Sequence, residues 1–281
     1  MTYSNYQFIL PVYNESNRIV NVLQHYYAYC RFITVIDNFS TDNTVDLILS
    51  NFPCVRVVSI SNDGTTETPK WWLDAASYFT QEFVLFGSCS EFISPDLLSI
   101  YNTIAELSSV DICLSTRRTI TGGYCTDPLY CKASTLLSPS IILPQVARLV
   151  RWRSIKPHLI KPHDTFRSQV HCRILSISAS SRELCILHNR PMPAFKLLNP
   201  KLKMYARQQA LYSKTKNPLF AIADSFLRSI LDTLRVFRSI IFCQYNIAIG
   251  IEFLQRIVMH FLVIYYSIIH SYNHRMRNAS F

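Results

Sequence analysis

The chain has 281 residues, of which 49% are hydrophobic and 16% charged, with five glycines and thirteen prolines. This composition excludes a fibrous, low-complexity or polytopic membrane protein, and the length suffices for one large domain or one domain with an appendage. The nine cysteines are odd in number and form no CxxC pair, so neither a zinc site nor a disulfide framework is indicated.

The net charge of +10 is divided unevenly along the chain. Residues 1–147 carry 7 Lys/Arg and 13 Asp/Glu, a balance of −6, whereas residues 148–281 carry 21 and 5, a balance of +16. The basic half therefore predicts an anionic partner: phosphate groups, a membrane surface or nucleic acid. The first sixteen residues lack the basic region and long apolar core of a signal peptide, so a cytoplasmic chain is expected.

Short, β-branched runs predict strands at five roughly even positions: Phe8–Leu10, Phe32–Ile36, Val55–Ile60, Phe83–Phe86 and Asp111–Ser115. Helical patterns lie between them. Residues 17–29 place four apolar side chains on one stripe, Thr41–Thr44 should cap a helix that buries Val45, Ile48 and Leu49, and Ser94-Pro95-Asp96 reads as a further helix start. Repeated β-α units of this spacing indicate an α/β fold with a doubly wound, mostly parallel sheet.

Polar loops follow three of these strands: "PVYNES", "DNFSTDNT" and "SCSE". Parallel strands end together, so these loops should open on one edge of the sheet, where ligands bind in such folds. No GxGxxG or Walker loop is present, which excludes those two nucleotide-binding motifs. Tyr13 offers a flat ring for a base, and Asp37 and Asn38 offer hydrogen-bond partners for a base or ribose.

The segments "FILPVYNESNRI", "ITVIDNFSTDNT" and "FVLFGSCSEFISPDLL" together resemble the family 2 glycosyltransferases with a GT-A fold, closest to the lipopolysaccharide-core and O-antigen sugar transferases. The resemblance covers about the first hundred residues. It implies a nucleotide-sugar donor held by the first two loops, with these residues at the nucleotide: Pro11, Tyr13 and Glu15 at the base, Asp37 at base or ribose, and Asn38 and Ser40 in the second loop. The alternative is that Asn14, Asn38 and Asp42 only cap helices and close turns.

Members of that family usually carry Asp-x-Asp-Glu after the fourth strand, where the carboxylates hold a divalent cation that bridges the donor diphosphate. The aligned residues here are Ser88, Cys89, Ser90 and Glu91. Neutral hydroxyls are poor ligands for a hard cation such as Mg²⁺ or Mn²⁺. Three interpretations stay open: Glu91 holds a weak, hydrated metal; Lys70 or an arginine of the basic half neutralises the diphosphate without metal; or catalysis is lost.

Inverting sugar transfer needs a base for the acceptor hydroxyl. The segment "RLVRWRSIKPHLIKPHDTFRSQ" resembles a family stretch that ends in a His-Glu pair carrying this base, and the matching pair is His163-Asp164. Asp164 is also the only acid between Asp127 and Glu183, amid many cations, so it stays ionised; a salt-bridge role is the alternative. Asp127 is the reserve candidate for the base, and the resemblance places His188 near the diphosphate.

Residues 218–272 are apolar apart from a polar stripe on one helix: Glu252, Arg256, His260, Ser267, Ser271 and His274. Arg228, Arg235 and Arg238 alternate with apolar residues before it. Basic and aromatic residues on amphipathic helices favour a helix in the headgroup layer of an anionic membrane, with a packed helical subdomain as the alternative and a spanning helix less favoured. The expected domains are 1–215, with a donor half (1–115) and an acceptor half (116–215), and a membrane-associating helical segment (216–281).

The resemblance implies an inverting glycosyltransferase that moves a sugar from a nucleotide-diphosphate donor to a lipid-linked or lipopolysaccharide-type acceptor. The charge and the C-terminal helix pattern add the expectation that it is peripheral on the inner face of the cell membrane. The missing Asp-x-Asp pair leaves a second possibility, a non-catalytic sugar- or partner-binding protein of the same fold. Nucleic-acid binding by the basic half is a third possibility, disfavoured by the greasy C-terminus.

Overall fold

The computed structural model describes residues 5–61, 69–107, 109–131, 136–137, 143–157, 166–168, 172–178, 184–190, 203, 206, 210 and 218–279. By their contacts the residues fall into two compact units. The first is built from residues within 1–118, 145–158 and 165–189, and the second from residues within 119–144, 159–164 and 190–281.

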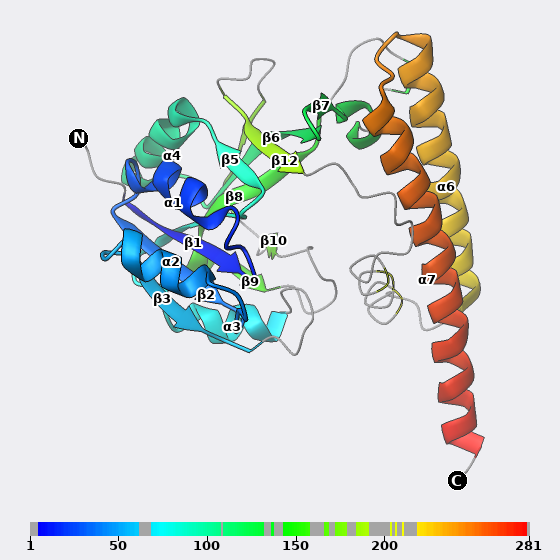
Figure 1. Ribbon diagram of the computed structural model, residues 1–281, viewed down its shortest axis with the longest axis horizontal. Helices are drawn as coiled ribbons and strands as arrows, with labels where there is room; N and C mark the ends of the chain where they lie inside the picture. The colour runs from blue at the N-terminus through cyan, green and yellow to red at the C-terminus, as the bar shows by residue number, and fades with distance from the viewer. Residues whose placement is uncertain are drawn as a thin grey trace. The chain divides into compact units, whose positions relative to one another are not determined.

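The first unit holds a parallel block of four strands in the order β3-β2-β1-β4, of which Figure 1 labels β1, β2 and β3. Their bounds are β1 Tyr6–Val12, β2 Phe32–Asp37, β3 Arg56–Ser59 and β4 Phe83–Phe86. Each matches a strand expected from the sequence. In the register Val12 lies beside Asp37 and Asp37 beside Ser59, so these strands end at one edge, as parallel pairing requires.

The sheet continues past β4 in the order β8-β6-β12-β5. The bounds are β5 Glu91–Ile93, β6 Ile112–Thr121, β8 Gln145–Arg151 and β12 Ile186–Arg190, with β11 Ile174–Ile177 and β7 Tyr124–Cys125 paired to β6. Strand β8 runs antiparallel to both β4 and β6 and separates them. The fifth predicted strand, β6, therefore points in the same direction as β4 but is not its neighbour. A separate short pair joins β9 Ile155–Pro157 to β10 Phe166–Ser168.

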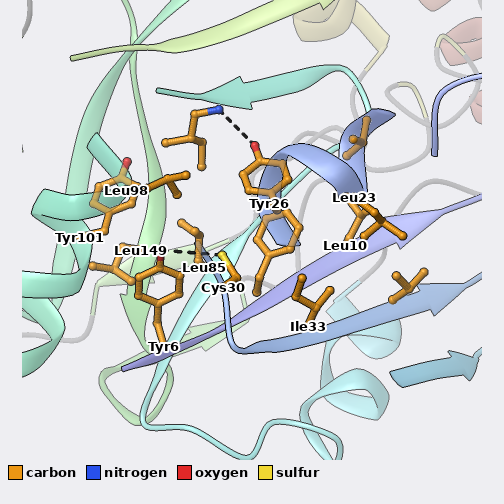
Figure 2. Close-up of a cluster of buried hydrophobic side chains, with 14 of the residues drawn as sticks. Tyr6, Leu10, Leu23, Tyr26, Cys30, Ile33, Leu85, Leu98, Tyr101 and Leu149 are labelled. Carbon is orange, nitrogen blue, oxygen red and sulfur yellow. Dashed lines mark hydrogen bonds between the residues drawn. The ribbon is translucent and has the colours of Figure 1, made fainter. Parts of the chain in front are cut away.

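Helices cover both faces of the parallel block. Neighbouring residues of a buried strand point to opposite sides, so each strand contributes to the core on both faces. Tyr6, Phe8 and Leu10 of β1 pack in one cluster with α1 Ile19–Tyr27, α2 Thr44–Asn51 and α4 Pro95–Leu107, whereas Ile9 packs in a second cluster with α3 Pro69–Ala76. Figure 2 shows the first cluster, in which the Tyr26 ring stacks on Phe8 with centroids 4.1 Å apart. The α/β class with a doubly wound, mostly parallel sheet is confirmed.

Two of the expected helix faces can be compared with the structure. Helix α1 buries Ile19, Val22, Leu23 and Tyr26, the four residues of the predicted stripe. Helix α2 buries Thr44 and Ile48, but Leu49 is exposed. The expectation for Leu49 was wrong because Leu47 packs against the core in its place, a choice that one short helix pattern does not decide.

The second unit contains the 3₁₀ helix Asp127–Tyr130 and two long helices, α6 Pro218–Ile241 and α7 Ile247–Ala279. The helices form an antiparallel hairpin, in which Arg256 of α7 bonds to Asp232 of α6 at 3.1 Å. Asn246, at the hairpin turn, donates a hydrogen bond to the Cys125 carbonyl at 2.7 Å. The predicted C-terminal helical appendage is therefore present, and its turn is held against β7.

The close approach of β1 to the end of β4 generates the first prediction. A Cβ atom on Gly87 would lie 2.3 Å from the tip of the Phe8 ring, which is fully buried. We expect Gly87→Ala to lower the free energy of unfolding by about 1 to 3 kcal/mol, because the stacked ring has no space to move into. Chemical denaturation measures this. In a Phe8→Leu background the same change should cost less, and equal costs in both backgrounds would contradict the steric explanation.

Candidate functional site

The loops that follow β1 and β2 are joined into one surface at the carboxyl edge of the sheet. Asn14, which has a left-handed backbone (φ 53°), donates its amide to the Ser40 hydroxyl at 2.9 Å, and its side-chain oxygen accepts from the Thr41 amide at 2.7 Å. The Glu15 amide donates to the Thr44 hydroxyl at 2.8 Å. The "PVYNES" and "DNFSTDNT" segments therefore hold each other in place.

Asp42 has the turn-closing role considered for it, and the Thr44 hydroxyl donates a hydrogen bond to its carboxylate. Asp42 accepts hydrogen bonds from the amides of Thr44 and Ser16, both at 3.1 Å. Burial would raise the pKa of Asp42, but hydrogen bonds from Thr44 and Ser16 outweigh this effect and lower it to about 2. The charged acceptor thus fixes the start of α2 against the first loop at neutral pH.

The residues expected at the nucleotide lie along this edge. Pro11 is near the end of β1 and is partly buried, and Tyr13 leaves its ring exposed. Asp37 is buried and accepts two bonds at 3.1 Å from the Ser40 amide, while the Asn38 amide donates to the Val12 carbonyl at 2.9 Å. Asp37 therefore shapes the second loop through hydrogen bonds of its own.

Of the two other residues expected at the nucleotide, Glu15 and Lys70, the structure describes the side chain of Glu15 alone. Glu15 accepts two bonds from the Arg18 guanidinium, each 2.7 Å long, so its carboxylate is already paired. Lys70 lies in the first turn of α3, and its side chain is outside the described part of the chain. The nucleotide roles of both residues stay predictions.

A hollow at the same edge was missed by the sequence reasoning. It has a volume of about 540 Å³ and lies where β2 and β3 end beside α3, lined by Phe39, Ser59, Ile60, Ser61, Leu73, Asp74, Ser77 and Tyr78. Phe39 has φ 56° and an exposed ring. A bulky aromatic residue rarely adopts this left-handed conformation. In the sequence, the sign of the hollow was an aromatic residue within an otherwise polar loop.

Glu91, the one carboxylate left from the expected metal motif, is 2% exposed and sits in β5. Its two oxygens accept bonds from the Arg148 guanidinium at 2.7 and 2.8 Å, and Arg117 lies 3.5 Å away. The register of β12 places His188 opposite Glu91. Burial would raise the pKa of Glu91, but attraction and hydrogen bonding from Arg148, with attraction from Arg117, hold it below its ordinary value.

This geometry does not fit the expected role of Glu91 as a metal ligand, because both of its oxygens are engaged by Arg148. The hydroxyls of Ser88 and Ser90 lie 3.0 Å apart and bond to one another. Among the residues that the structure describes, no group of three or more His, Cys, Asp or Glu side chains could hold a metal ion. The Arg148 and Arg117 contacts were not foreseen, although a lone acid and an arginine-rich strand were both visible in the sequence.

Of the three residues considered for proton transfer, the structure describes Asp127 alone. His163 and Asp164 lie outside the described residues. Asp127, the reserve candidate, is buried, and its carboxylate accepts a hydrogen bond from the Thr119 amide at 2.7 Å. That contact gives Asp127 a turn-forming role in the second unit.

No protein-family model matches this sequence, and no curated protein sequence matches it. Solved structures of similar architecture include the mannosyltransferase PcManGT from Pyrobaculum calidifontis in complex with GDP-Man and Mn²⁺, at 13% identity and TM-score 0.48, covering 96% of this chain and 88% of that one. S. aureus TarS 1-349 in complex with UDP-GlcNAc is similar at 14% identity and TM-score 0.47, covering 86% and 73%. GalNAc-T7 with UDP, GalNAc and Mn²⁺ is similar at 11% identity and TM-score 0.47, covering 79% and 51%.

The buried pair generates a stability prediction. We expect Glu91→Gln to lower the free energy of unfolding at neutral pH by about 3 to 5 kcal/mol, because the partly buried Arg148 loses the bidentate contact with the buried carboxylate. The matched control is Glu82→Gln, which removes the half-exposed partner of Arg151 and should cost less than about 1 kcal/mol. Denaturant unfolding of both variants measures the difference.

The difference in unfolding free energy between the wild type and Glu91→Gln should also depend on pH. The folded-state pKa of Glu91 is below its ordinary value of 4.5, so the pair contributes fully above about pH 4.5 and is lost as pH falls through the folded pKa. The gap between the wild type and Glu91→Gln should therefore narrow in acid. A gap that stays constant to low pH would contradict a charged Glu91.

Proposed function

We propose that the protein is a glycosyltransferase that binds a nucleotide-diphosphate sugar at the carboxyl edge of β1, β2 and β4. The observation that carries the proposal is the mutual bonding of the first two loops through Asn14, Ser40 and Thr41. It presents the exposed Tyr13 ring and the loop closed by Asp37 at one edge. A flat ring with polar loop atoms beside it suits a base and ribose.

The base and diphosphate would use different parts of this edge. The base would lie beside the exposed Tyr13 ring, and the hollow lined by Phe39, Ile60 and Tyr78 adds apolar and aromatic surface at the same edge. The diphosphate would lie toward Ser88 and Ser90, at the end of β4, where hydroxyl groups can donate hydrogen bonds.

We further propose that the diphosphate is neutralised by cationic side chains and not by a divalent metal. Ser88 and Ser90 are neutral, and the Glu91 carboxylate is occupied by Arg148. Lys70, on the same helix as Leu73 and Asp74 of the hollow, is the candidate cation on the donor side. A lysine ammonium suits this role, because it can contact phosphate oxygens as a point charge.

For the transfer step we propose inversion at the anomeric carbon with Asp164 as the base. The acceptor hydroxyl oxygen attacks that carbon from the face opposite the diphosphate, and the proton of the hydroxyl passes to the Asp164 carboxylate. The bond from carbon to the diphosphate oxygen breaks, so the nucleoside diphosphate leaves with the bonding electrons. The many cations from residue 148 onward are the reason we expect Asp164 to be ionised and able to accept the proton.

The proposed acceptor is a lipid-linked or lipopolysaccharide-type glycan, reached from the cytoplasmic side of the cell membrane during cell-surface glycan synthesis. Such an acceptor is anionic, and the balance of +16 after residue 147 complements it. Nucleic acid is not the proposed partner, because the basic half continues into an apolar helical segment.

A second candidate function is favoured by one observation. The aspartates expected after β4 are serines, and the remaining acid is buried in an ion pair. A protein that binds nucleotide sugar or a membrane partner without transferring the sugar would need no carboxylate there. The two candidates differ in turnover, not in nucleotide binding.

The transfer assay combines UDP-, GDP- and dTDP-sugars with a lipid-linked glycan acceptor and follows release of the nucleoside diphosphate. We expect Asp164→Asn to lower the rate at least about 100-fold, because the acceptor proton loses its base, while nucleotide binding is unchanged. The control is Asp46→Asn on the exposed face of α2, which should transfer normally.

Each other outcome selects a different interpretation. Full transfer by Asp164→Asn would remove that residue from the mechanism. Nucleotide binding without turnover of any donor would favour the non-catalytic candidate. No binding of any nucleotide would contradict the proposed site.

A further inference from the structure

The α6–α7 hairpin has the opposite polarity to a water-soluble helical pair. The side chains it buries include charged and polar groups on both helices: Ser225, Asp232, Arg238 and Ser239 on α6, and Glu252, His260 and Ser267 on α7. Glu252, His260 and Ser267 of the polar stripe expected on α7 are thus turned inward, while the side chains of Ser271 and His274 lie outside the described residues.

The outward faces of the same helices are apolar apart from the exposed Asp224–Arg228 pair of α6. On α6 the exposed large residues are Phe220, Phe226, Leu227, Ile230, Leu234, Phe237, Ile240 and Ile241, and on α7 they are Ile247, Leu254, Phe261, Tyr265, Ile268 and Ile269. The helices run side by side (Figure 1). Apart from Arg238, which lies on the same stripe as Leu234 and Ile241 near the turn, the buried polar residues of each helix lie on the side opposite its exposed residues. Over most of their length the two apolar faces therefore point away from one another.

The buried Asp232 carboxylate is paired within the hairpin. Asp232 bonds to Arg235 at 2.7 Å, to Arg256 at 3.1 Å and to His260 at 3.3 Å. Arg238 donates to the Gln244 side chain at the hairpin turn. Pairing of a buried charge inside a helix pair reduces its cost in hydrocarbon surroundings, where a lone charge is costly.

The turn end of the hairpin is tied to protein in a similar way. Glu252 accepts hydrogen bonds from the Tyr130 hydroxyl at 2.7 Å and from the Thr121 hydroxyl, and pairs with Arg190 at 3.3 Å. Arg256 lies over the Tyr130 ring, 4.5 Å from its centroid. The polar residues of α7 thus bond to α6 and to the segments that carry Thr121 and Tyr130. The apolar face of α7 takes part in none of these bonds.

The apolar face is long enough to meet a full bilayer core. Ile247–Ile269 of α7 is the one segment among the described residues that is long and apolar enough to cross a membrane, with mean hydropathy 1.8 and only 28% of it buried. Its 23 residues extend about 35 Å as a helix, against about 30 Å for bilayer hydrocarbon. A core helix of a soluble protein would be mostly buried.

We propose that the α6–α7 hairpin is inserted in a lipid bilayer, with hydrocarbon against the outward faces of both helices and the Asp232 network in its interior. Charge supports an anionic bilayer as the partner. Arg275 and Arg277 follow the apolar part of α7 in the sequence. Insertion differs from the expected surface-lying helix, whose polar side would face the headgroups. The proposal does not depend on the proposed sugar transfer.

The test uses the full chain and vesicles of phosphatidylcholine with phosphatidylglycerol. We expect the protein to float with the vesicles, to remain after washes with concentrated salt and with alkaline carbonate, and to be released by detergent. Phe237→Glu and Phe261→Glu should each weaken partitioning at least about tenfold, because each places a charge on a lipid-facing position.

The matched control is Leu49→Glu, which adds the same charge at an exposed leucine on α2 of the first unit and should leave partitioning unchanged. Both phenylalanines are well exposed, so the variants should fold, and their thermal unfolding checks this. Release of the wild type by salt alone would overturn insertion in favour of surface adsorption. A stable dimer that Phe237→Glu dissociates, with no vesicle binding, would overturn it in favour of contact between two copies of the chain.

Discussion

The pairing of Glu91 with Arg148 is the interaction on which the middle of the sheet depends. A carboxylate that is 2% exposed is stable only when its charge is matched, and the bidentate guanidinium contact at 2.7 and 2.8 Å supplies that match. The pair joins β5 to β8, and the same carboxylate is approached by Arg117 from β6. The Tyr26 hydroxyl of α1 donates to the Glu91 carbonyl at 2.9 Å. One residue thus connects three strands and a helix.

This arrangement has a consequence for chemistry at the end of β4. In the family that the sequence resembles, acids at this place hold a cation that carries the diphosphate charge. Here the one acid that is left is committed to an arginine, and the neighbouring Ser88 and Ser90 bond to one another. The negative charge of a donor would then be met by positive side chains, which the second half of the chain holds in large excess.

Local patterns in the sequence predicted much of the fold. The strand positions, the buried face of α1 and the start of α4 after Ser94 follow from short-range preferences, and all three are present. Long-range pairing was less accessible. Nothing local indicates that β8 enters between β4 and β6, and Glu91 meets Arg148 only because of that insertion.

In the C-terminal helices, too, long-range contacts decide what local sequence patterns leave open. The spacing of Glu252, Arg256 and His260 correctly indicated a polar stripe on α7. Periodicity tells which residues share a face, but not whether that face meets water or protein. Partners far along the chain, Asp232 and Tyr130, decide that the stripe is inside. The nucleotide edge is an intermediate case, since its loops were recognised while the Asn14 contacts and the Phe39 hollow were not.

Calorimetric titration of the protein with UDP, GDP and dTDP, in EDTA and again in Mn²⁺, is the most direct measurement of whether the donor site works without metal. If Glu91 is held by Arg148 and cationic side chains meet the diphosphate, at least one nucleotide binds, with the same affinity in both conditions. Binding that needs Mn²⁺ and disappears in EDTA would show that a cation is held at the end of β4 and would contradict the metal-free site.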